Sequence, residues 1–78
     1  MTLSELRLLY HQDQLVEAII EPSIQENMWI VEFRHTRGGL VPLTDSKGCE
    51  QHYQDVDMAS KSALAVGFNQ VRIANDSN

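Results

Sequence analysis

The chain has 78 residues, 42% of them hydrophobic and 22% charged, and its net charge is −5. Its length suits one small domain, and its apolar runs fall far short of the roughly 20 residues that span a bilayer, which excludes a transmembrane helix. The acidic balance argues against general nucleic-acid binding, and the single Cys49 excludes an internal disulfide. We expect one domain over residues 1–75 with a frayed polar tail at 76–78, and a cytoplasmic location because the start lacks a secretory signal.

A short first helix is predicted directly after the N-terminus. Thr2 and Glu5 have the spacing of a capping box, in which each side chain bonds a free amide of the first turn. The residues that follow at helical spacing would form its buried stripe: Leu3, Leu6, Leu9 and Tyr10. Residues 11–14 are polar and should end the helix.

The stretch from Leu15 to Glu21 is predicted to be an amphipathic strand. Val16, Ala18 and Ile20 alternate with more polar residues, so they should share one face. A helix is the competing interpretation, but one helix from Leu3 to Glu21 would carry apolar residues around nearly its whole circumference. Residues 22–27 then form a hairpin connection.

Three further strands follow, joined by glycine-containing turns. In 29–34 the residues Trp29, Val31 and Phe33 alternate with polar residues, and only Ile30 breaks the pattern. The turn at 36–39 leads to a returning strand at 40–43, and the turn at 45–48 leads to a short strand at 49–53.

A second helix is predicted from about Asp57 to Val66, because Val56, Ala59 and Ala63 recur at helical spacing. Asp55 and Asp57 can cap its start, and Gly67 should end it in a left-handed conformation. A last strand then covers residues 71–73. The predicted fold is α+β, with two helices on a mainly antiparallel sheet of four to five strands, in the order α-β-β-β-β-α-β.

A family resemblance rests on this layout and on four short stretches. They are 16–21 (VEAIIE), 29–32 (WIVE), 42–48 (PLTDSKG) and 56–59 (VDMA). Together with the short N-terminal helix they resemble a family of small bacterial α+β proteins that is classed as a domain of unknown function. The resemblance implies a fold but no activity, cofactor or catalytic residue.

The histidines and the cysteine are the first candidates for chemistry. Cys49 could be activated by His52 or His35, with Asp45 nearby. In an extended strand, however, Cys49 and His52 point to opposite faces, which favours a partly buried structural cysteine. His11, His35 and His52 lack the spacing of a ligand pair, so no catalytic residue, metal or cofactor is predicted.

Charged residues supply the remaining candidates. The basic hairpin at 34–39, with Lys47, could bind an anion through arginine forks and glycine amides. Its candidate binding residues are Arg34, His35, Arg37, Gly38, Gly39 and Lys47. Helix capping accounts for Asp55 and Asp57 beside Glu50, and a solvated acidic face is expected from Glu17, Glu21, Glu26 and Glu32.

We therefore predict a non-enzymatic protein-binding or regulatory module, whose partner is another protein or a second copy of the chain. The first helix and the strand edge at 72–74 are its candidate contact surfaces. The alternative is an anion or nucleic-acid binder that uses the hairpin at 34–39.

Overall fold

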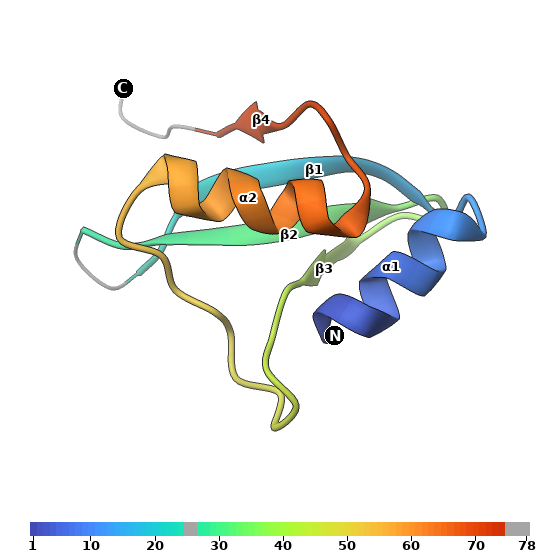
Figure 1. The fold of residues 1–78 in the computed structure, drawn as a ribbon, viewed down its shortest axis with the longest axis horizontal. Coiled ribbons are helices and arrows are strands. Elements are labelled where there is room, and N and C mark those ends of the chain that lie inside the picture. Colours follow the sequence, from blue (N-terminus) through green and yellow to red (C-terminus); the bar gives the residue numbers. More distant parts are fainter. Residues whose placement is uncertain (25–26, 75–78) are drawn as a thin grey trace.

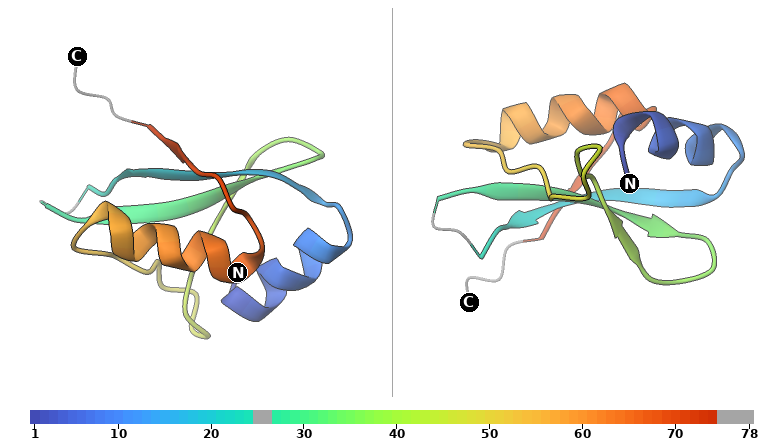
Figure 2. Two further views of the ribbon diagram at one scale, coloured as in Figure 1. Left: turned by 45° about the horizontal axis from the view of Figure 1, so that its top comes forward. Right: turned by 90° about the horizontal axis from the view of Figure 1, so that it is seen from below.

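The computed structural model describes residues 1–24 and 27–74, and the predicted tail at 76–78 lies outside them. Within this part, two helices and four strands follow one another as α1 (Leu3–His11), β1 (Leu15–Pro22), β2 (Trp29–His35), β3 (Leu40–Pro42), α2 (Val56–Val66) and β4 (Arg72–Ile73). The strands form one sheet in the order β3-β2-β1-β4, and both helices lie on the same face of it (Figures 1 and 2). The prediction of an α+β fold with two helices is confirmed.

The sheet is mixed rather than purely antiparallel. β1 is antiparallel to β2 over a register that runs from Leu15 opposite His35 to Pro22 opposite Trp29, and β3 is antiparallel to β2. β4 is parallel to β1 through only two residue pairs. A parallel neighbour requires a crossover connection, and α2 provides it by crossing the sheet before the chain returns to β1.

The predicted strand at 49–53 does not form, so the order of elements is α-β-β-β-α-β. This segment makes only two isolated bridges, Thr44 with Glu50 and Trp29 with Tyr53. The reason lies in the turn before it, where the Asp45 carboxylate accepts from the amides of residues 47 and 49 at 2.8 and 3.0 Å. An aspartate that bonds its own turn in this way competes with a regular strand ladder.

Both helices begin as their capping residues predict. The Glu5 carboxylate accepts from the Thr2 amide at 2.8 Å while the Thr2 hydroxyl accepts from the Glu5 amide at 3.3 Å, which confirms the capping box. α2 is capped by Asp55, whose carboxylate accepts from an amide of the first turn at 2.8 Å. Asp57 lies within that first turn, so Asp55 alone is the N-cap residue of α2.

Gly67 ends α2 with a φ of 142°, which confirms the predicted positive angle. The position also has no room for a side chain, because a Cβ there would lie 2.5 Å from the Tyr10 ring. Tyr10 packs edge-on against Phe68, which stacks in turn on Phe33 of β2. The end of α2 is thereby fixed to α1 and to the sheet.

The hydrophobic core fills the space between the helices and the sheet. The residues that form its buried cluster are Leu6, Leu15, Ala18, Ile20, Val31, Phe33, Leu43, Ala59, Ala63 and Val66. The predicted inward face of β1 is wrong at one position, since Leu15 is buried while Val16 is 55% exposed. A register shift between Leu15 and Glu17 makes a bulge at Val16, which lets Leu15 and Ala18 point inward although they are three residues apart.

Candidate functional site on the open face of the sheet

The sheet has a second face, which we call the open face because both helices lie on the other side (Figure 2). The residues of β1, β2 and β4 whose side chains alternate with the core residues belong to it: Glu17, Ile19, Glu21, Ile30, Glu32, Arg34 and Arg72. Ile19 and Ile30 are only 2% and 8% exposed although they stand outside the core cluster. Their neighbours carry long charged side chains, whose stems can cover apolar atoms.

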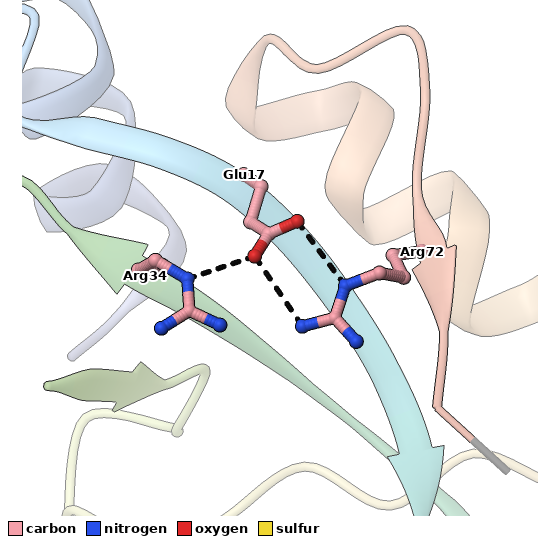
Figure 3. A network of polar contacts seen from close by, with 3 residues as sticks. All are labelled: Glu17, Arg34 and Arg72. Carbon is pink, nitrogen blue, oxygen red and sulfur yellow. Dashed lines mark hydrogen bonds and ion pairs between the residues drawn. The ribbon is translucent and has the colours of Figure 1, made fainter.

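At one end of the open face a single carboxylate joins two guanidinium groups (Figure 3). The Arg34 Nε donates to Glu17 Oε2 at 2.8 Å. The Arg72 Nε donates to Glu17 Oε1 and its Nη2 to Oε2, both at 3.3 Å. We call Arg34 and Arg72, which share the Glu17 carboxylate, the arginine pair. Glu17, Arg34 and Arg72 come from three different strands, β1, β2 and β4.

The arginine pair keeps donors that Glu17 does not use. Each guanidinium carries five N–H groups, and in the described part of the chain both terminal nitrogens of Arg34 and one of Arg72 have no bonded partner. Figure 3 shows these nitrogens pointing the same way, away from the Glu17 carboxylate. The side chains of Arg34 and Arg72 are 43% and 51% exposed, so a ligand in solution can reach them.

The charge of the arginine pair is not balanced. Hydrogen bonds from Arg72 and then from Arg34 hold the pKa of Glu17 below its ordinary value, so this carboxylate is ionised at neutral pH. Two positive charges therefore share one negative charge, and a local excess of one positive charge remains on an otherwise acidic protein.

A groove of about 260 Å³ lies beside the arginine pair. It opens where the segment before β4 runs apart from the first residues of β1, and its lining residues are Val16, Glu17, Ala18, Phe68, Asn69, Gln70, Val71 and Arg72. This volume of about 260 Å³ lies just below the usual range for small-molecule sites, which begins at about 300 Å³. It suits one side chain or a small anion, with Arg72 at its wall.

The other end of the open face is acidic. Burial, then a hydrogen bond and the charge of Glu21, and then the charge of Glu50 raise the pKa of Glu32 to about 7. Oε1 of Glu32 is buried and meets no donor among residues 1–24 and 27–74. A raised pKa means that Glu32 keeps its proton closer to neutral pH, and this proton can be donated to Glu21.

These findings correct the predicted solvated acidic face. Glu17 is held by two arginines and Glu32 is partly buried, so the prediction is wrong for both. Glu26 lies outside the described residues.

The candidate binding residues of the predicted hairpin site do not come together in the structure. Arg34 points onto the open face, and the His35 Nδ1 accepts from the Arg37 amide at 3.1 Å to close the turn. Gly38 and Gly39 have φ angles of 96° and 83°, which explains their place in this turn. Lys47 lies in the turn that follows β3, where its amide donates to the Asp45 carboxylate.

Sequence reasoning missed the partners of Arg34. Arg72 is 55 positions from Glu17, and only the parallel register of β4 brings the two together. No local pattern in the sequence contains that register, although the alternation of 71–73 did indicate a strand.

The cysteine and histidine cluster does not converge in the described structure. Cys49 is exposed, which corrects the expectation of partial burial. The His52 Nδ1 shares a hydrogen bond of 3.0 Å with the Ser23 hydroxyl. His52 is next to Tyr53, which bridges to Trp29 at the start of β2. His35 lies at the opposite end of β2. Among the residues described, no group of three or more possible ligands could hold a metal ion.

Comparisons with models of protein families, with curated proteins and with solved structures gave no match. The resemblance to small bacterial α+β proteins therefore stays a prediction. Neither of the helices described has the length and apolar character needed to cross a membrane.

Proposed function

We propose that this protein is a non-enzymatic, cytoplasmic binding module that holds an acidic segment of a partner protein on the open face of its sheet. The observation that carries the proposal is the arginine pair, in which Arg34 and Arg72 share one carboxylate and keep donors directed away from it. A second carboxylate placed at those donors would balance the charge.

The chemistry of the arginine pair favours a carboxylate. The planar guanidinium fork matches the two oxygens of a carboxylate, and charge-assisted hydrogen bonds of this kind contribute about 1.5–3 kcal/mol each. The groove beside Arg72 offers space for the side chain that carries the carboxylate. Apolar atoms of Val16 and Phe68 in its lining suit the neighbouring part of a peptide.

Polyanions fit less well than a short acidic segment. Glu21 and Glu32 belong to the same face, Glu50 is close enough for its charge to act on Glu32, and the whole chain carries a net charge of −5. A nucleic-acid backbone that entered at the arginine pair would be repelled there. Arg37 remains exposed at the hairpin tip, which keeps anion or nucleic-acid binding as the second candidate.

The test is a titration of the isotope-labelled protein with a glutamate-rich peptide, followed by NMR. We expect the amide signals of Glu17 and the side-chain Nε signals of Arg34 and Arg72 to shift, and the affinity to fall at least tenfold in Arg72→Gln. Arg7→Gln removes the same charge from the exposed side of α1 and should leave the affinity unchanged.

Three further probes complete the titration: a lysine-rich peptide, inorganic phosphate and a short oligonucleotide. Equal shifts with the lysine-rich peptide, or equal losses in the Arg72 and Arg7 variants, would overturn the proposal. Binding of the oligonucleotide alone, with shifts centred on Arg37, would favour the second candidate instead.

A further inference from the structure

The charges of the open face are separated along the direction of the strands. Ile19 of β1 and Glu32 of β2 lie opposite one another and form a central row. The cross-strand pair Glu17 and Arg34 lies two residues to one side of this row. The cross-strand pair Glu21 and Ile30 lies two residues to the other side. Arg72 is level with Ile19 on β4, but its guanidinium reaches back to Glu17, so both guanidinium groups gather at one end of the surface. Glu21 marks the acidic end of the same surface.

A surface with this pattern is complementary to itself. A second copy that fits this surface can be generated by a two-fold axis that lies in the plane of the interface. The axis runs perpendicular to the strands, over the row of Ile19 and Glu32. Rotation about it reverses the strand direction of the second copy. Each residue then faces the residue that is equally far on the other side of that row. Glu21 of the second copy is thereby placed over Glu17, between the guanidinium groups of Arg34 and Arg72.

We propose that the partner of the open face is a second copy of this chain, packed face to face so that Glu21 of each copy binds the arginine pair of the other. This inference rests on the proposed function, because it uses the same donors. Two guanidinium groups then meet two carboxylates at each end of the interface, and the unused donors of Arg34 and Arg72 find acceptors.

The usual spacing of two packed sheets also fits this arrangement. Sheets that pack face to face are separated by about 10 Å, a distance that arginine and glutamate side chains can span from opposite sides. Ile19 lies close to the proposed axis but is only 2% exposed, so the contact would be made by the charged side chains around it. Glu32 also lies at the axis, so the Glu32 residues of the two copies would face one another at the centre of the interface.

The sheet edges are less suitable for joining two copies. On the outer edge of β3, the amino group of Met1 donates to the Pro42 carbonyl at 3.2 Å and the Thr44 amide donates to the Met1 carbonyl at 2.7 Å. Proline has no amide to offer a further strand. β4 presents only two residues at the opposite edge, so a strand-to-strand dimer would gain few bonds there.

The test uses charge reversal on purified full chains, with mass measured by sedimentation velocity over a range of concentrations at low salt. We expect the wild type to form a dimer, and Arg34→Glu and Glu21→Arg each to weaken it at least tenfold through like charges at both ends. A mixture of the two variants should form a heterodimer, since each reversed charge then faces its opposite.

A control mixture of Arg7→Glu and Asp57→Arg, which alter exposed charges on the helices, should keep the wild-type mass. NMR spectra report whether each variant is folded, and Arg34→Gln with Glu21→Gln replaces a variant that is not. The milder substitutions should each weaken the dimer, with no recovery on mixing.

Two results would refute the second copy. One is a wild type that stays monomeric at every concentration, and the other is a mixture of charge-reversed, folded variants that stays monomeric. If such a monomer still binds the glutamate-rich peptide through Arg72, the proposed function stands and only the self-association falls. If the peptide does not bind either, both proposals fall.

Discussion

Replacement of Glu32 by glutamine should make the folded protein more stable above pH 7. Burial and the neighbouring Glu21 raise the pKa of Glu32 from 4.5 to about 7, so the folded chain holds a proton that the unfolded chain has already released. Between about pH 4.5 and pH 7 the wild type therefore loses stability as the pH rises, and above that range the loss is complete. Glutamine removes this titration.

The size of the effect follows from the shift. A change from 4.5 to about 7 corresponds to an upper limit of about 3.5 kcal/mol, at roughly 1.4 kcal/mol for each pH unit. Glu32 is only partly buried, so screening by water reduces the value. We expect Glu32→Gln to gain about 1–2 kcal/mol at pH 8 and little at pH 5.

Urea unfolding at pH 5, 6, 7 and 8 measures this difference, at a protein concentration low enough to keep the chain monomeric. Glu21→Gln provides the matched control, since it removes the second cause of the shift and should flatten the pH profile only in part. Glu5 and Glu17 have lowered pKa values and titrate below this range, so they do not obscure the result. Equal slopes for the wild type and Glu32→Gln between pH 5 and pH 8 would refute the reasoning.

Three further predictions concern single positions. Gly67→Ala should lower the free energy of unfolding in urea by about 2–5 kcal/mol, because a Cβ strains the positive φ and also meets the Tyr10 ring at 2.5 Å. Gly39→Ala is the control: its φ is also positive but the space around it is open, so it should cost only about 1–2 kcal/mol. Similar costs for the two alanine variants would show that contact with Tyr10 is unimportant. Asp55→Ala should cost about 1 kcal/mol by leaving the first turn of α2 without its cap, and amide exchange should speed up in that turn alone. Glu17→Gln should lower the unfolding midpoint at neutral pH, with a smaller loss in high salt, since the ion pairs of Arg34 and Arg72 are exposed to solvent. A loss that does not respond to salt would contradict the ionic origin.

Local signals predicted most of the fold. The capping box at Thr2, the aspartate caps and Gly67 each act over a few residues, so the sequence places the helix ends well. Alternation of Val31 and Phe33 with polar residues likewise predicts β2 and its inward face. These features need no knowledge of the rest of the chain.

The errors arise where bonds between distant residues or within a turn compete with the local pattern. The bulge at Val16 depends on pairing with β2, and the alternation of β1 alone cannot show it. The segment after Gly48 has the composition of a strand, but Asp45 takes two of its turn amides. The sequence makes Arg34 a candidate binding residue of the hairpin loop, but the register of the sheet directs its side chain onto the open face instead.

The charged residues of the open face make more sense as binding groups than as stabilising ones. Exposed ion pairs such as those of Glu17 add little to stability, and Glu32 is expected to lower it at neutral pH. The guanidinium groups of Arg34 and Arg72 have unused donors, and the carboxyl group of Glu21 could accept from them. Within one copy they stand at opposite ends of the face, whereas a second copy turned about the row of Ile19 and Glu32 brings the two ends together. A partner that covers this face would thus stabilise the groups that are least well satisfied in the single chain.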